Sequence, residues 1–242
     1  MKAIQFTLSG KTAHFKRPDV NAYAYFTYNH IPKVTLLGLL GAILGIKGYL
    51  DQGEKEFPEF YERLKGLKVA IVPIGRHQGV FSKKIQVFNN SVGYASQEAG
   101  NNLIIREQWL EEVVWRIYIS SESNVEEELL KKLFENLLNQ KAIFIPYLGK
   151  NDHTASITDV KLIELSDVPN AERLDSLYLS SEVTLDEETW NDKRPYTFED
   201  ILPLRLNVIG MYECERVGKT NRVVVHAKQP IYKSEIDYVM FL

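Results

Sequence analysis

The chain has 242 residues, of which 45% are hydrophobic and 25% are charged, and its net charge is −3 at pH 7. This composition is that of an ordinary globular protein, and the length favours a main domain with a smaller appended part. The single cysteine, Cys214, excludes an internal disulfide framework and indicates a reducing, cytoplasmic setting. We expect neither a secretory signal nor a membrane span, because the most apolar run, residues 34–46, is too short to cross a bilayer.

Charge is unevenly distributed along the chain. Residues 1–50 carry six cations and one acid, a net charge of +5, so the remaining residues carry −8. A basic segment on an acidic body can hold a polyanion locally. The plainer interpretation, an uneven but solvated surface, stays open on charge alone.

Hydrophobic periodicity predicts six elements in the first two thirds of the chain. They are a strand over residues 3–8, a buried helix over 34–46, strands over 68–74 and 112–120, an amphipathic helix over 125–138 and a strand over 142–148. The order βαββαβ is the ferredoxin-like or RRM-type α+β arrangement. The sheet face of this fold is a common platform for single-stranded RNA.

Two further regions complete the predicted organisation. An insertion at about residues 75–111 is too long for a simple loop, and its basic first part alternates like the strands of a β-hairpin, so we expect a thumb-like hairpin. After residue 165 the chain becomes acidic, with a strand over 222–227. We therefore expect an RRM-like domain over residues 1–165 and a small C-terminal β-rich lobe over residues 166–242.

Several catalytic and cofactor motifs are absent. Two Gly-Lys-Thr triplets occur, but a P-loop needs a glycine at the positions that Gln5 and Glu213 hold, so ATP or GTP binding is not expected. The five histidines do not pair at metal-ligand spacing, and no cysteine cluster accompanies them. The sequence therefore predicts neither a metal site nor a cofactor.

Three glycines, Gly38, Gly41 and Gly45, fall within the predicted apolar helix. Each costs roughly 1 kcal/mol relative to alanine in a helix interior, so close packing must compensate. A tightly docked helix would fix its N-terminus near residues 31–35, where free N–H groups and the helix dipole favour a phosphate. Lys33 would add a full charge there.

The segment before this helix, residues 10–30, mixes cations with aromatic residues. Cations for phosphates beside aromatic faces for bases form the composition of a single-strand binding site. The alternative, in which the aromatic residues belong to the core and the cations to the solvated surface, is equally open on composition alone.

The same residues carry a resemblance to a known family. Gly10, Lys11 and the run Ala13–Arg17 (AHFKR), followed by residues 31–45 (IPKVTLLGLLGAILG), resemble the Cas5 family of CRISPR-associated proteins, within the RAMP superfamily and in its type I-B form. The layout agrees, with a thumb-like insertion and a Pro-Tyr-Leu-Gly segment at residues 146–149. A glycine-rich loop near the C-terminus, frequent in the superfamily, is missing here.

The resemblance implies a non-catalytic subunit of a type I Cascade interference complex in antiviral defence, which binds the 5′ handle of the crRNA and caps the backbone filament. Its partners would be the crRNA, the repeated backbone subunit and the large target-recognising subunit, with target DNA met indirectly and no membrane. The thumb would lie over the first spacer bases. The expected RNA-binding residues are Lys11, His14, Phe15, Lys16, Arg17, Tyr28, Lys33, Arg76, His77, Lys83, Lys84, Arg106 and Lys150.

Two other functions remain as alternatives. A related variant, type I-C, processes CRISPR precursor RNA as a metal-independent endoribonuclease, which needs a base for the 2′-OH and an acid for the leaving oxygen. His14, Tyr28, His30, Lys33 or His77 could serve, but no spacing singles out a pair, so we assign no catalytic residue. The third possibility is a protein-interaction module unrelated to RNA.

Overall fold

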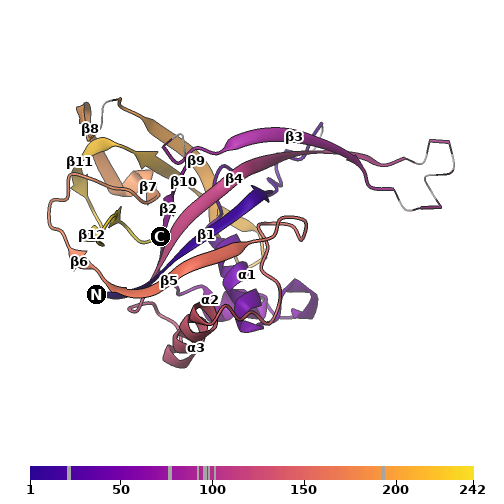
Figure 1. Ribbon diagram of the computed structural model, residues 1–242, viewed down its shortest axis with the longest axis horizontal. Helices are drawn as coiled ribbons and strands as arrows, with labels where there is room; N and C mark the ends of the chain where they lie inside the picture. The colour runs from indigo at the N-terminus through magenta and orange to yellow at the C-terminus, as the bar shows by residue number, and fades with distance from the viewer. Residues whose placement is uncertain are drawn as a thin grey trace.

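A five-stranded antiparallel sheet forms the centre of the protein in the computed structural model, which describes residues 1–20, 23–75, 78–91, 93–94, 97, 99–100, 102–191 and 194–242. Four of its strands follow the order β2-β4-β1-β5, and the fifth, β3 (Ser82–Asn89), pairs with β4 (Figure 1). The bounds are β1 Lys2–Ala13, β2 Val69–Pro73, β4 Ile104–Ser120 and β5 Ser156–Glu164. This order, with every pair antiparallel, is the ferredoxin-like arrangement, so the predicted fold class is confirmed.

Both faces of this sheet are covered. One face packs on the helices α1 (Lys33–Leu44), α2 (Glu59–Leu64) and α3 (Glu127–Leu138), and its core includes Ile4, Phe6 and Leu8, the alternating residues of the first strand. The other face packs on C-terminal residues such as Val239 and Phe241. All five residues of β2 are therefore buried. No helix in the described part of the chain is both long and apolar enough to cross a membrane.

The predicted fourth strand is wrong. Residues 142–148 form an irregular segment, and its amides cap the C-terminal end of α1: the Ile143 N–H donates to the Ile43 carbonyl at 3.2 Å and the Phe144 N–H to the Ala42 carbonyl at 3.0 Å. The actual strand, β5, escapes a period-2 search because of a bulge. Its register shifts opposite Phe6, and Asp159 takes a left-handed φ of 54°.

The apolar helix ends earlier than predicted, and Gly45 terminates it. Gly45 has a φ of 75°, and its N–H donates to the Ala42 carbonyl, so it is the left-handed C-cap of α1 rather than an interior residue. Gly41 permits a close approach to α2, since an added Cβ would lie 2.8 Å from the Cβ of Phe60. At Gly38 the nearest atom to such a Cβ is 3.6 Å away.

These two glycines give a paired prediction for stability. Gly38→Ala should stabilise the protein by up to about 1 kcal/mol, because alanine is the better helix former and its methyl group fits. Gly41→Ala should destabilise it, because α2 must move to admit the methyl group. Urea unfolding of both variants measures the difference, and equal stabilities would contradict the close α1–α2 contact.

The insertion contains the predicted hairpin. β3 (Ser82–Asn89) pairs with the first half of β4, from Ser82 opposite Glu111 to Asn89 opposite Ile104. The hairpin extends well beyond the sheet (Figure 1). The third strand is therefore longer than predicted, because the same strand serves both the sheet and the thumb.

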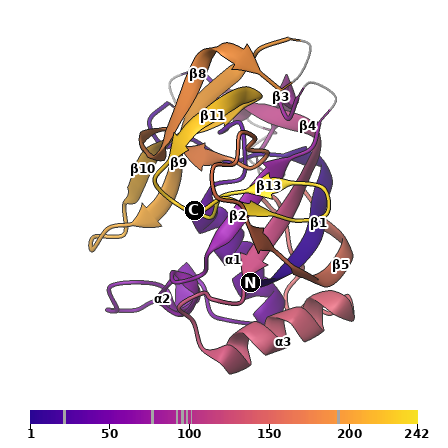
Figure 2. The same cartoon turned by 90° about the vertical axis from the view of Figure 1, so that its left-hand side faces the viewer.

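The C-terminal part is β-rich and folds against the main core. Its strands are β6 (Ser166–Asp167), β7 (Tyr178–Leu179), β8 (Val183–Trp190), β9 (Thr197–Leu206), β10 (Tyr212–Thr220), β11 (Arg222–Ala227), β12 (Tyr232–Lys233) and β13 (Tyr238–Val239). β8 and β11 lie at the end of the molecule away from α3 (Figure 2). β9 and β10 add Leu202, Leu204, Leu206 and Val217 to the core that contains α1, so this part helps to hold α1 in place.

Candidate functional site

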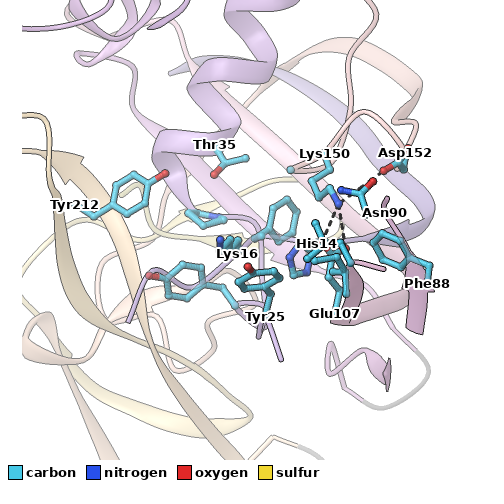
Figure 3. A pocket seen from close by; sticks show the side chains of 16 residues that line it. His14, Lys16, Tyr25, Thr35, Phe88, Asn90, Glu107, Lys150, Asp152 and Tyr212 are labelled. Atoms are coloured by element: carbon cyan, nitrogen blue, oxygen red, sulfur yellow. Dashed lines mark hydrogen bonds and ion pairs between the residues drawn. The ribbon is translucent and has the colours of Figure 1, made fainter. Parts of the chain in front are cut away.

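A cavity of about 600 Å³ lies where six segments meet (Figure 3). The segments are the residues directly after β1, the strand-like residues 25–28, the start of α1, residues 88–90 and 103–107 of the β3–β4 hairpin, the loop after residue 148 and the first residue of β10. The lining residues are His14, Phe15, Lys16, Tyr25, Tyr28, Pro32, Thr35, Phe88, Asn90, Leu103, Ile105, Glu107, Gly149, Lys150, Asp152 and Tyr212. Five of the predicted RNA-binding residues are in this set: His14, Phe15, Lys16, Tyr28 and Lys150.

In the segment after β1, the neighbouring cations Lys16 and Arg17 line two different hollows. It stays extended and bridges to the strand-like residues 25–28, with the Tyr28 N–H donating to the Phe15 carbonyl at 2.9 Å. Successive side chains of an extended segment alternate in direction. Lys16 therefore lines the cavity, whereas Arg17 lines a separate hollow of about 390 Å³ with Lys83.

Phe15 and Tyr28 belong to the core. Phe15 is 3% exposed and its ring packs 6.0 Å from that of Trp115, and Tyr28 is 4% exposed. The accessible aromatic residue beside them is Tyr25, whose ring lies 3.9 Å from the Lys16 ammonium. For these two predicted residues the core interpretation holds, and they form the floor of the cavity rather than a stacking surface.

Gly149 fixes the loop that closes one side of the cavity. It has a φ of 91°, and an added Cβ would lie 2.0 Å from the His14 carbonyl oxygen. The loop is attached to the end of β1 by the His14 N–H, which donates to the Leu148 carbonyl at 3.1 Å. Only glycine permits this close approach of two backbones.

The next residue, Lys150, is held by a buried acid. Its ammonium lies 2.9 Å from Glu107 Oε1 and 3.8 Å from Asp152, and dashed lines join Lys150 to Glu107 in Figure 3. Glu107 is 4% exposed and also accepts the Trp109 indole N–H at 2.9 Å. Burial alone would raise the pKa of Glu107, but the hydrogen bonds from Lys150 and Trp109 hold that pKa below its usual value. Glu107 therefore stays ionised and neutralises Lys150.

Two buried histidines lie next to this ion pair. His14 Nδ1 donates to the Gln108 carbonyl at 2.9 Å, and His153 Nδ1 lies 2.7 Å from the Thr12 hydroxyl. Burial lowers the pKa of both imidazoles, so both are neutral at pH 7. Among the described residues, neither Nε2 atom has a hydrogen-bond partner.

The start of α1 borders the same cavity through Pro32 and Thr35. No side chain caps this helix, and its first turn contains no acid. The first N–H groups of a helix have no intrahelical partner, so this end can receive an anion. Lys33 does not add its charge here: its ammonium donates to the Leu242 carbonyl at 2.7 Å, and burial lowers its pKa to about 8.

The remaining predicted residues lie outside the cavity. Lys11 is exposed on β1, and Lys84 is ion-paired with Glu111 at 3.6 Å. Arg106 is exposed on the thumb, 5.9 Å from the ring of Tyr23. Arg76 and His77 lie outside the described residues. Within the described chain, no cluster of three or more His, Cys, Asp or Glu could hold a metal ion.

Sequence reasoning missed Glu107, Gly149, Phe88 and Tyr212 as parts of the site. Glu107 looks like any acid in an alternating strand, and Tyr212 lies far away in the chain. Gly149 was predicted only as the last residue of the Pro-Tyr-Leu-Gly segment, with no role in the site. No local signal distinguishes these residues, because the fold alone brings them to the cavity.

His30 gives a pH prediction. Burial lowers its pKa to about 3, with Lys219 and Lys83 adding to the effect. Below pH 6.5 the His30 imidazole takes up a proton in the unfolded chain but stays neutral in the folded protein. The free energy of unfolding should therefore fall by about 1.4 kcal/mol for each pH unit of acidification from this residue. His30→Asn should flatten the pH dependence between pH 6.5 and 4. The same substitution at the exposed His226 is the control, and equal slopes in both variants would contradict the assignment.

Comparisons with known proteins agree with this architecture. The model of the protein family described as CRISPR-associated protein (Cas_Cas5) matches residues 3–229 of this chain. A crystal structure of a CRISPR protein from Archaeoglobus fulgidus is similar with a TM-score of 0.52 at 12% identity, over 99% of this chain and 98% of that one. A chain of a CRISPR RNA-guided surveillance complex is similar with a TM-score of 0.51 at 13% identity, over 92% of this chain and 91% of that one. At these identities the structural likeness shows the fold alone. No curated protein matched the sequence.

Proposed function

Because the chain belongs to the Cas5 family of CRISPR-associated proteins, we propose that it is a non-catalytic RNA-binding subunit of a type I Cascade interference complex. In this proposal the cavity beside α1 holds part of the 5′ handle of the crRNA, and the thumb lies over the guide. The backbone subunit and the large target-recognising subunit are its protein neighbours, target DNA is met indirectly, and the complex works in the cytoplasm in antiviral defence.

One observation carries the RNA assignment: the cavity joins a cation, an aromatic ring and an uncapped helix start. Lys16 makes no ion pair with any described residue, and it lies over Tyr25. Single-stranded nucleic acid is held by cations on its phosphates and aromatic rings on its bases. The helix start beside Thr35 offers N–H groups to a further phosphate.

The state of three of the five candidate acids and bases supports a non-catalytic role. His14 is neutral and enclosed, Lys33 is bound to the last residue, and burial raises the pKa of the Tyr28 hydroxyl. Acid–base catalysis works best when the pKa values of the groups lie near the working pH and the groups reach the substrate. None of these three groups meets both conditions.

Incubation of the purified protein with its cognate CRISPR repeat RNA, with and without EDTA, tests this assignment. We expect binding of the 5′ handle without cleavage. Specific cleavage that His14→Ala abolishes would establish the endoribonuclease instead. Failure to bind handle RNA, both alone and in the assembled complex, would favour a protein-interaction module.

Lys16 should account for one phosphate contact. Lys16→Ala should weaken handle binding and reduce the slope of log K against log salt by about 0.7, the value for one phosphate on a single strand. Titrations by fluorescence anisotropy at four salt concentrations measure the slope. Lys141→Ala, which removes an exposed lysine at the end of α3, is the control, and an unchanged slope in Lys16→Ala would remove Lys16 from the site.

A further inference from the structure

A second hollow, here called the α1 groove, lies along the outer side of α1. It has a volume of about 610 Å³ and shares Thr35, Gly149 and Tyr212 with the cavity described above. Thr35, Gly38 and Ala42 of α1 line it, at spacings that place them on one face of the helix. Because these side chains are small, this face leaves the helix backbone open to close approach.

Two segments border the groove. Residues 143–149 follow α1 from its C-terminal end, where Ile143 donates to the Ile43 carbonyl, to its start, where Gly149 lies near Thr35. From this segment Ile145 is 79% exposed. The short helix η1 (Tyr49–Asp51) contributes the second border, in which Leu50 is fully exposed.

The apolar surface continues beyond the groove at the turn between β9 and β10. Val208, Ile209 and Met211 are 70%, 78% and 59% exposed and directly precede Tyr212. The turn is ordered, because the Asn207 side chain accepts the N–H groups of Ile209 and Met211. Exposed apolar side chains held in a fixed turn next to a groove residue indicate an interaction site.

The charges show which class of partner fits. Of the lining residues of the groove, only Lys47 and Asp51 are charged, one of each sign. A nucleic-acid backbone needs cations, and the neighbouring cavity supplies Lys16, whereas the groove offers no excess of them. A neutral groove with aromatic and aliphatic borders resembles the core of a protein interface.

We infer that the α1 groove receives the apolar face of a helix from a neighbouring protein subunit. The inference rests on the proposed function, which makes this chain one subunit of a complex. A helix packs on another at 8–10 Å between axes, and the small residues of α1 allow that approach. The 12 residues of α1 extend about 18 Å, which matches three turns of a partner helix. Thr35, Gly149 and Tyr212 would then contact both the partner helix and the RNA site.

Two variants test the groove without touching residues of the RNA site. Ala42→Trp fills the floor, and Ile145→Asp places a charge on a border residue that is too exposed to affect folding. Each should lower recovery of one protein subunit at least tenfold when the complex is assembled from its co-expressed subunits and crRNA. Both should leave handle binding by the isolated protein unchanged. Val225→Asp is the matched control, because it places the same charge on an exposed apolar residue of β11 (63% exposed) outside the groove lining, and it should assemble normally.

The outcomes separate this inference from the proposed function. Normal assembly of both variants contradicts the inference that the groove receives a partner helix. Loss of handle RNA binding with intact protein assembly also contradicts it, because the groove would then be an RNA subsite. If the unaltered protein binds no handle RNA, either alone or in the assembled complex, the proposed function fails, whatever the groove variants do. A photo-crosslinking residue at Leu50 in the assembled complex should attach to a helical peptide of a partner subunit. Attachment to crRNA alone, or to nothing, contradicts the inference.

Discussion

Gly149→Ala should displace the loop over residues 148–153 from the end of β1 and remove most of the affinity for RNA. A Cβ at this position would lie 2.0 Å from the His14 carbonyl oxygen, so the loop and the end of β1 must separate. The backbone also sits at a φ of 91°, where a non-glycine residue costs about 1–3 kcal/mol. Lys150 and Asp152 would move with the loop. We expect a Tm at least about 5 °C lower and handle affinity reduced tenfold or more.

Gly53→Ala separates the two causes. Gly53 also has a left-handed φ, of 57°, but nothing lies within 4 Å of an added Cβ. It should therefore show only the backbone cost, with handle binding intact. Thermal unfolding and anisotropy titration of both variants make the comparison. If the two variants behave alike, the contact between Gly149 and His14 does not govern the cavity.

The fold could be predicted largely because its strongest signals are local. The alternating residues of β1 and the apolar stripe of α3 follow directly from the periodicity of a sheet and a helix, each with one buried face. The fourth strand could not be located in this way. Residues 142–148 are apolar because they cap and border α1, whereas β5 loses its alternation at the bulge at Asp159. Both causes are tertiary, so the window of sequence around each segment does not contain them.

The candidate site shows the same limit more strongly. Residue types alone suggested cations and aromatic residues between positions 10 and 33, and Lys16 does line the cavity. Lys33 is a cation at the start of the helix, as predicted, but its ammonium donates to the carbonyl of Leu242, 209 residues further along the chain. Burial likewise places Phe15 in the core. Sequence reasoning found the region of the site, and long-range contacts decide which side chains face the cavity.

Glu107→Gln should tighten RNA binding while it weakens the fold. An acid in a site for a polyanion is unfavourable, and here the carboxylate neutralises Lys150 at 2.9 Å. The amide keeps an acceptor for Trp109 but releases the charge of Lys150 toward the cavity. We expect several-fold higher affinity for any single-stranded RNA and a salt slope steeper by about 0.7, since one more cation meets a phosphate. Loss of a buried charge-assisted hydrogen bond should cost about 1.5–3 kcal/mol of stability.

Asp152→Asn distinguishes release of Lys150 from a change in net charge. It removes one negative charge from the same cavity, but Asp152 is 61% exposed and lies 3.8 Å from Lys150, so Glu107 still holds the ammonium. Its salt slope should therefore stay near that of the unaltered protein. Equal steepening in both variants would mean that the overall charge of the cavity matters and the Glu107–Lys150 pair does not. Steepening in Glu107→Gln alone would show that a buried acid keeps one cation of the site from the RNA.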